Sequence, residues 1–293
     1  MLLTHETTIV LNKNDANIVG HMCYAAYKLW NVCNYERTNY KNLGLEKYPD
    51  WYYQKSKHKD DLWFKSLPSQ TAQEICKLLD KSWKSFYRLK ESGGIENPGT
   101  PRYKKDKMPI TYMQNGIQHE TGSFKVRLSL PKKLKEYMVH TYDIRAAYLY
   151  LKNPVFSNMD IIKQIKIYPP ANDGTSRILV IYEVEDVLPE EDNGHYLSID
   201  LGLHNLMTCY DNAGKTFIIG REYLSLSYFY NREIARVQSQ WDRIQVAWEM
   251  EYPKTSKHLQ KLYRKKNNCI KDYIHKMTRY ITNYYVKNDI HTV

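Results

Sequence analysis

The residue best placed to do chemistry is Asp200, in the segment Ser198-Ile199-Asp200-Leu201-Gly202. The apolar residues around this carboxylate predict a strand that ends in a tight glycine turn, and a second strand follows. Cleavage of a phosphodiester by two metal ions about 3.5–4 Å apart requires several convergent carboxylates. His204 and His275 have no partner at a metal-ligand spacing. The sequence therefore predicts no metal site, and a simple turn residue is an alternative for Asp200.

The charge balance favours an acidic partner. The 293 residues contain 43 Lys and Arg against 32 Asp and Glu, which gives a formal net charge of +11. Such an excess favours a polyanion such as nucleic acid, although a merely basic surface is an alternative. The chain also has 27 tyrosines, many of them interleaved with cations. Flat rings beside cations can stack on bases while the cations contact phosphates, which strengthens the prediction of nucleic-acid binding.

The cysteines and the N-terminus indicate the compartment. The five cysteines contain no Cys-x-x-Cys pair, so neither a zinc knuckle nor a disulfide framework is readable, and a reducing compartment is favoured. Met1–Glu6 lacks a basic segment followed by an apolar stretch. No run approaches the roughly 20 apolar residues that span a bilayer. We therefore predict a cytoplasmic, nucleoid-associated protein with no membrane partner.

The periodicity of apolar residues predicts helices in the first third of the chain. Thr7–Leu11 is predicted to be a short strand, and apolar residues recur every three or four positions from Ile18 to Val32, which indicates an amphipathic helix. A loop is predicted from Tyr48 to Trp63. A second helix should begin at Pro68 and end near Glu91, because the glycine pair and prolines that follow cannot continue it.

Alternation of apolar and polar residues predicts strands further on. From Phe124 to Leu130 this pattern places Lys125 and Arg127 on one face of a half-buried strand. Further strands are predicted around Ile165–Ile167 and over Arg177–Val187, with a turn at 172–174 between them. An acidic linker over Leu188–Gly194 should follow, and then a meander of three strands over Tyr196–Leu201, Asn205–Tyr210 and Lys215–Ile219. Two long helices, separated at Pro253, are predicted over Tyr223–Met250 and Lys257–Lys287.

Several of these segments resemble one known family. The similarity lies in Leu67–Gln73, Asp80–Arg88, Pro98–Lys104, Ser198–Leu206 and the helix that carries Asp272, His275 and Lys276. Together they resemble TnpB, the transposon-encoded RNA-guided nucleases ancestral to type V CRISPR effectors. Ser198–Leu206 resembles the first RuvC motif of these nucleases, and the helix resembles their basic bridging segment. The resemblance covers nearly the whole chain in order.

The resemblance implies an α+β multidomain protein. A wedge-type β-barrel is expected over 1–12 and 103–190, and a helical recognition lobe is inserted in it over 13–102. A truncated RuvC domain of RNase H-like fold, with a long helical hairpin, is expected over 191–293. The implied partners are a guide RNA and double-stranded target DNA that carries a short duplex motif, with no metal required for binding. A homodimer on one RNA is one of the arrangements known in the family.

The chain also departs from the family pattern. TnpB nucleases continue with a strand that bears a Glu, a four-cysteine zinc module and a closing Asp, none of which occurs in these residues. Asp200 matches the first catalytic position only, as a vestigial residue. The chain is therefore most similar to the TnpB-like nuclease-dead repressors, which occupy target DNA under RNA guidance. The alternatives are the N-terminal portion of an active TnpB endonuclease and a general RNA-binding protein without DNA targeting.

By the match to TnpB, the duplex motif is expected to be read from the start of the second helix, joined by residues that follow the glycine and proline break after that helix. The candidates are Ser69, Gln70, Gln73, Tyr112, Met113 and Gln114. Glutamine can make a bidentate contact to adenine, and Met or Tyr can touch a thymine methyl group. Helix capping by Ser69 and a solvated face for the glutamines are alternatives. Clustered cations are the RNA-binding candidates: Arg102, Lys104, Lys105, Arg127, Lys132, Lys133, Lys261, Arg264, Lys265, Lys266 and Lys276.

Overall fold

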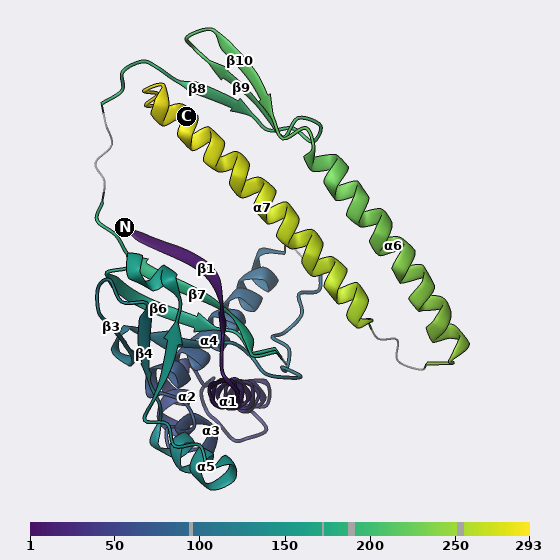
Figure 1. The fold of residues 1–293 in the computed structure, drawn as a ribbon. Helices are drawn as coiled ribbons and strands as arrows, with labels where there is room; N and C mark the ends of the chain where they lie inside the picture. Colours follow the sequence, from purple (N-terminus) through teal and green to yellow (C-terminus); the bar gives the residue numbers. More distant parts are fainter. Residues whose placement is uncertain (94–95, 172, 187–190, 251–254) are drawn as a thin grey trace. The chain divides into compact units, whose positions relative to one another are not determined.

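The computed structural model describes residues 1–93, 96–171, 173–186, 191–250 and 255–293 (Figure 1). The chain divides into two compact units, Met1–Asp186 (unit 1) and Val187–Val293 (unit 2). Both units combine helices with antiparallel strands, so the predicted α+β class is confirmed. The predicted turn at Asn172, the start of the linker and the break at Pro253 lie outside the described residues.

Unit 1 contains two open antiparallel sheets. The larger has the order β1-β7-β6-β2 and consists of β1 (Leu2–Val10), β2 (Ile110–Met113), β6 (Ile161–Ile167) and β7 (Thr175–Glu183). The smaller has the order β3-β4-β5 and consists of β3 (Ile117–His119), β4 (Lys125–Ser129) and β5 (Tyr148–Lys152). Alternate side chains of most of these strands are buried in one hydrophobic core, to which β1 contributes Ile9.

The expectation of a closed barrel is wrong, because no strand ladder joins the two sheets within the described residues. After β2, the 3₁₀ turn η1 (Gln114–Gly116) ends the pairing with β6. The next strand, β3, pairs with β4 of the smaller sheet. Near the other edge, the side-chain amide of Asn153 donates to the carbonyl of Thr8 at 3.0 Å. The link between the end of β5 and β1 is therefore made by a side chain, whereas a closed barrel would require backbone hydrogen bonds between these two strands.

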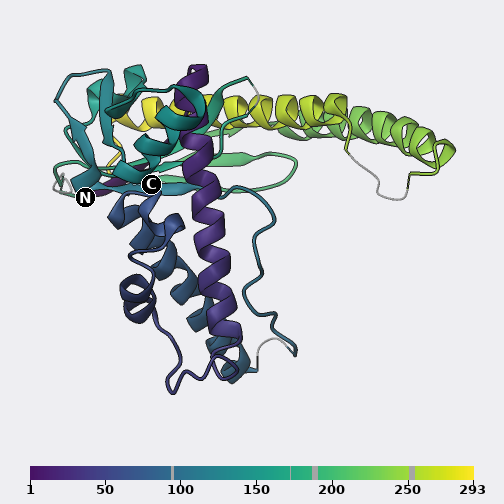
Figure 2. The ribbon, with the colours of Figure 1, turned by 90° about the horizontal axis from the view of Figure 1, so that it is seen from below.

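The described part of unit 1 has five helices, and the two long ones contact the sheets. α1 (Lys13–Thr38) begins where the Asn12 side chain accepts the backbone N–H of Asp15 at 2.8 Å. α4 (Ser69–Ser92) ends at Gly93, which has a φ of 64° that favours glycine. The two helices lie side by side (Figure 2) and bury apolar faces in the core of unit 1. Both were predicted from their periodicity.

The three shorter helices were not predicted. α2 (Trp51–Lys57) and α3 (Leu62–Lys65) lie in the segment expected to be a loop, and α5 (Lys132–Tyr142) follows β4. Asp50 caps α2 by accepting the backbone N–H of Tyr53 at 2.8 Å. The loop prediction for Tyr48–Trp63 is therefore wrong over most of its length.

Unit 2 combines a small sheet with two long helices, as predicted. β8 (Leu197–Asp200), β9 (Met207–Asp211) and β10 (Lys215–Ile219) form a meander, and α6 (Tyr223–Ala247) and α7 (Lys257–Lys287) lie side by side as an antiparallel pair (Figure 1). The segment after α7 returns to the sheet, where Leu197 donates its backbone N–H to the carbonyl of Thr292 at 2.9 Å. Among the described helices, none is both long and apolar enough to cross a bilayer.

Candidate nucleic-acid interface

A groove of about 810 Å³ in unit 1 brings together part of the predicted motif reader. Ser69 and Gln73 line it from the first turns of α4. Five lysines from α2, α3, α5 and the loop after α2 share the same lining: Lys55, Lys59, Lys65, Lys132 and Lys133. Side-chain amides can read base edges, and lysines contact phosphates. This groove, which we call the motif groove, therefore has the chemistry needed to bind a duplex.

The start of α4 is held by backbone and side-chain contacts. Pro68 occupies the cap position, so Ser69 is the first helical residue and its side chain is exposed rather than used as the helix cap. The buried Thr71 donates its hydroxyl to the carbonyl of Thr111 in β2 at 2.8 Å. This bond fixes α4 against the strand that leads to Met113 and Gln114, of which Met113 is half-buried and Gln114 exposed.

Two of the predicted motif-reading residues, Tyr112 and Gln70, do not line the motif groove. Tyr112 is fully buried, and its hydroxyl donates to the carbonyl of Ser129 at 3.0 Å, with burial raising the pKa of the phenol. It therefore does not fit a role in contacting bases. The reason is the two-residue period of β2, which turns Tyr112 inward with Ile110. Gln70 is half-buried and does not line the motif groove, and its buried Oε1 has no hydrogen-bond partner among the described residues.

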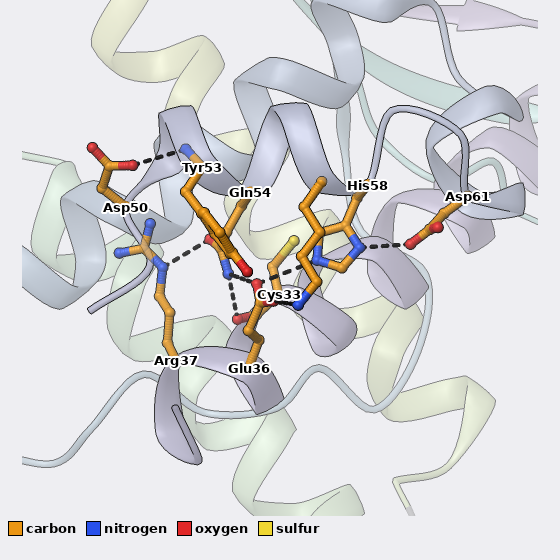
Figure 3. Close-up of polar contacts among 9 residues, drawn as sticks. Cys33, Glu36, Arg37, Asp50, Tyr53, Gln54, His58 and Asp61 are labelled. Carbon is orange, nitrogen blue, oxygen red and sulfur yellow. Dashed lines mark hydrogen bonds and ion pairs between the residues drawn. The ribbon is translucent and has the colours of Figure 1, made fainter. Parts of the chain in front are cut away.

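A buried polar cluster that the sequence did not reveal positions the lysines of α2 (Figure 3). Gln54 of α2 donates to the carboxylate of Glu36 at 2.9 Å and to the carbonyl of Cys33 at 2.8 Å. Arg37 donates to Gln54 at 2.8 Å and pairs with Asp80 of α4 at 2.9 Å. Because these groups are almost fully buried, the cluster fixes α2 against α1 and α4, with Lys55 facing the motif groove.

The charges within this cluster are strongly coupled. Burial raises the pKa of Glu36, but hydrogen bonds from His58, Lys57 and Gln54 outweigh it and lower this pKa to about 2. Burial lowers the pKa of His58, but its contacts with Glu36 at 3.3 Å and Asp61 at 2.5 Å outweigh that effect and raise the pKa above its ordinary value. Glu36 therefore stays ionised, and its charge favours the protonated histidine.

Among the predicted RNA-binding residues, Arg127 belongs to a row of paired cations and rings on β4 and β5. The Arg127 guanidinium lies 4.3 Å from the centre of the Tyr148 ring, and Lys125 Nζ lies 3.9 Å from that of Tyr150. Val126 and Leu128, on the opposite face, are buried. The cations therefore lie on one accessible face, as predicted, where cations and π-faces are available together.

The exposed segment with Arg102, Lys104 and Lys105 has no regular secondary structure, yet it is fixed along α1. The Trp30 indole donates to the carbonyl of Arg102 at 3.1 Å, and Lys104 Nζ lies 4.6 Å from the centre of that tryptophan ring. Asn31 exchanges two hydrogen bonds, of 2.9 and 2.8 Å, with the backbone of Lys104. These bonds fix the backbone of Arg102 and Lys104 along α1.

The remaining RNA-binding candidates lie on α5 and α7. Lys132 and Lys133 are exposed at the start of α5 and lie 4.0 and 3.6 Å from Glu136. On α7 of unit 2, Lys261, Arg264 and Lys265 are exposed at helical spacing. Lys266 instead donates to Asn231 of α6 at 2.6 Å, which joins the two helices. Lys276 pairs with Asp272 at 2.7 Å, and this hydrogen bond raises the pKa of the lysine.

The carboxylates of the unit 2 sheet do not converge. Asp200 is exposed at the end of β8 and pairs in register with Thr208, whereas Asp211 pairs with Leu197. The two carboxylates therefore lie at opposite ends of the ladder, about 10 Å apart along the strands. No group of three or more His, Cys, Asp or Glu side chains that could hold a metal ion occurs in the part of the chain that is described.

Asp211 has a structural role in this sheet. It accepts the backbone N–H of Ala213 at 2.8 Å, lies 2.7 Å from His195 Nε2, and accepts the hydroxyl of Tyr284 at 2.8 Å. These contacts lower the pKa of Asp211 to about 2. Both carboxylate oxygens are engaged, so Asp211 joins the sheet to α7 and does not supply the second ligand that a two-metal centre would need beside Asp200.

Comparisons with known proteins were made for the sequence and the fold. Residues 179–293 match the family model OrfB_IS605, described as a probable transposase, and no curated protein matches the chain. The fold is similar to that in the cryo-EM structure of a Cas12f1-sgRNA-target DNA complex, with a TM-score of 0.53, 12% identity and coverage of 93% of this chain and 62% of that one.

A second solved structure, a CRISPR-Cas12f ternary complex, matches with a TM-score of 0.35, 14% identity and coverage of 93% and 61%. The chain thus spans about three fifths of the length of these solved chains. The transposase match covers the segment that holds Asp200, and the fold agrees with the resemblance seen in the sequence. The family match over residues 179–293 and the similarity in fold both support the TnpB family for this chain.

Proposed function

We propose that this chain binds DNA sequence-specifically under RNA guidance, with a guide RNA and double-stranded DNA as its partners. In such complexes base pairing with the guide reads the target, while the protein reads a short duplex motif beside it. The observation that carries the proposal is the motif groove, where Ser69 and Gln73 lie among five lysines. The similar Cas12f1 structure is a complex with sgRNA and target DNA, which supports the same pair of partners.

Each part of unit 1 has a role in this proposal. Gln73 and Ser69 contact base edges of the motif, joined by the exposed Gln114, and the groove lysines hold the phosphates. The rows of cations at Arg102–Lys105 and on β4 hold the guide RNA, together with those of α7 in unit 2. We retain the division into a wedge domain (1–12 and 103–190), a recognition lobe (13–102) and a RuvC-like domain (191–293) as part of the proposal.

We further propose that residues 1–293 hold their target without cutting it. Phosphoryl transfer by two metal ions requires charge stabilisation on both the attacking and the leaving oxygen. Asp200 offers one exposed carboxylate, and Asp211 is occupied by three hydrogen-bonding contacts. A protein that stays on paired DNA blocks a polymerase, so the proposed consequence is repression of transcription, with no metal needed for binding.

The test begins with sequencing of the RNA that co-purifies with the protein. That RNA then serves as guide for a supercoiled plasmid that carries the matching target beside a randomised motif, with Mg²⁺ or Mn²⁺ present. We expect guide-dependent retention of the plasmid without nicks, the same retention by Asp200→Ala, and lower expression of a reporter with this target in its promoter. A plasmid with a scrambled target is the control.

The outcomes separate the parts of the proposal. Guide-dependent cuts by residues 1–293 would overturn the non-cleaving function and favour an endonuclease. Retention that ignores the guide sequence would overturn RNA guidance and favour general nucleic-acid binding. The absence of any retained DNA or RNA would overturn the proposed function as a whole.

A further inference from the structure

A second hollow lies beside the motif groove in unit 1. It has a volume of about 770 Å³ and is bounded by α1, α3 and α5. Ligand pockets of roughly 300–1,000 Å³ hold small organic groups. The side chains that give this hollow its chemistry are His21, Tyr24, Trp63, Lys107, Lys133 and Tyr137. No residue in it belongs to the motif reader predicted from the sequence.

Two pairs of aromatic rings form part of the walls of the hollow. The Tyr24 and Trp63 rings meet edge to face with centroids 5.7 Å apart, and His21 meets Tyr137 at 5.1 Å. His21 Nε2 also lies 3.1 Å from the hydroxyl of Tyr142, which fixes the imidazole. Rings held edge to face in pairs leave faces on which a flat heterocycle can stack.

The charges around the hollow suit an anionic ligand with an uncharged ring. Lys107 and Lys133 line it against one carboxylate, Glu136, which lies 3.6 Å from Lys133. Burial and the neighbouring Lys107 lower the pKa of His21, so the imidazole is neutral at pH 7 and can exchange hydrogen bonds with a base edge. The cations are therefore available for phosphate while the aromatic walls remain uncharged.

The hollow adjoins the motif groove, because Lys133 and Glu136 line both. We propose that this hollow, the base pocket, takes one unpaired base of a nucleic-acid strand that is bound along the motif groove. The base stacks against these rings, and Lys107 and Lys133 contact its flanking phosphates. The proposal rests on the proposed function and adds to it a site that holds a single unstacked nucleotide, RNA or DNA, at the edge of the groove.

Gly20 offers a direct way to close the base pocket. It lines the hollow from within α1, and a Cβ built on it would find only Lys107 Nζ within 4 Å, at 3.7 Å. Glycine is unfavourable in a helix interior, so a leucine there is compatible with α1 and projects toward the pocket. Gly20→Leu therefore removes the space without removing a polar contact.

The experiment uses the full chain and two single-stranded probes of the same sequence, one RNA and one DNA, each with a single 5-iodopyrimidine. We expect irradiation to crosslink the iodinated base to Trp63 or Tyr137, located by mass spectrometry, and the more efficient probe identifies the strand type. In anisotropy titrations, Gly20→Leu and Tyr137→Leu should each weaken binding by about 5-fold or more. Tyr35→Leu, which removes an exposed tyrosine of α1 outside the pocket, should leave affinity unchanged.

The result that overturns the base pocket is distinct from failure of the proposed function. If the wild-type protein binds the probes but crosslinks form elsewhere and the pocket variants bind normally, the pocket is wrong and the proposed function stands. If the wild-type protein binds neither probes, guide nor duplex, the proposed function itself is wrong. If Gly20→Leu lowers the melting temperature, the position of the crosslinks and the affinity of Tyr137→Leu test the base pocket instead.

Discussion

Gln73 is the residue whose replacement should alter motif reading most clearly. It is half-buried on α4 and lines the motif groove, so its side chain remains partly accessible. A bidentate amide contact to adenine discriminates against other bases by about 1–3 kcal/mol. Gln73→Ala should therefore relax the preference at one motif position and leave the others unchanged, as measured by selection of bound targets from a randomised motif library.

A matched control for this variant is Gln118→Ala. Gln118 is an exposed glutamine on β3 that does not line the motif groove, so its loss should not change the selected motif. An unchanged preference in Gln73→Ala as well would remove α4 from motif reading. A uniform loss of binding at every position would instead indicate that Gln73 contacts the backbone.

The linked charges of Glu36 and His58 predict how the stability of unit 1 depends on pH. The pKa of Glu36 is depressed to about 2, so its contribution is present above about pH 4.5 and is lost as pH falls toward 2. The pKa of His58 is raised, so its contribution is full below about pH 6.5 and is lost as pH rises through the folded pKa. The two effects together favour the folded state most between about pH 4.5 and 6.5.

We therefore expect the free energy of unfolding, measured with urea, to fall between pH 5.5 and pH 8.5. His58→Gln should flatten this fall, because glutamine does not titrate. His140→Gln, which replaces an exposed histidine outside the cluster, is the control and should keep the wild-type slope. An identical pH dependence in wild type and His58→Gln would contradict the proposed coupling with Glu36.

The sequence identified site residues that lie in a short local motif, and it missed those that depend on contacts between distant positions of the chain. Ser69 and Gln73 were identified because a short local segment carries the resemblance, and the groove does contain them. Tyr112 was misplaced because the short strand β2 was not recognised, and with it the inward direction of that side chain. The buried cluster joins Glu36 to Gln54 and His58, 18 and 22 positions along the chain, and no local pattern encodes such contacts.

Among the helices, length decided which were predictable. α7 was predicted with its observed bounds, since a stripe of apolar residues continues over its 31 residues and Ser256 caps its start. α5 buries only Leu134 and Met138 in its 11 residues, and α2 buries only Gln54 in seven. A seven-residue helix of this kind depends on tertiary contacts for its stability, which explains why its sequence has no clear helical period.

The exposed cations of α7 allow an electrostatic test of guide binding at the level of one helix. Lys261, Arg264 and Lys265 are adjacent on its surface, and for single strands each phosphate that a cation neutralises adds about 0.7 to the salt slope. Replacing all three by Gln should weaken guide RNA binding and reduce the slope of log K against log salt by about 2. Lys266 is left in place because its bond to Asn231 supports the helix pair.

The matched control changes the same number of charges on another helix. Lys81, Arg88 and Lys90 are exposed on α4 and are not among the predicted RNA-binding residues. Their replacement by Gln should change the slope much less than the α7 variant does. Equal changes in both variants would mean that guide affinity reflects net charge alone and not a surface on α7.

For the molecule as a whole, the two units differ in how their cores are built. Unit 1 has one continuous hydrophobic core formed by both sheets and the helices around them. The described part of unit 2 has two small clusters, one between the sheet and the end of α7 and one between α6 and α7. The basic side chains are distributed over both units, so the net charge of +11 attracts any nucleic acid, and selectivity must come from pairing and motif reading.

This distribution of charge leads to a prediction about guidance. Without RNA, the protein should bind any duplex weakly, with a steep dependence on salt. With the guide, a duplex that carries both the motif and the complementary sequence should bind at least about 10³-fold more tightly than a scrambled duplex, as is typical of specific sites. Both dissociation constants must be measured at one salt concentration, and the mass of the complex gives the number of protein copies on one RNA.

The decisive control exchanges the guide and leaves the protein unchanged. A second guide with a new pairing segment should transfer the tight binding to the duplex that matches it, because the protein recognises the shape of the paired strands and the motif rather than the target sequence. Retention of the original site under the new guide would mean that the protein reads DNA directly. In that case the lysines and Gln73 of the motif groove would be parts of a conventional DNA-binding surface.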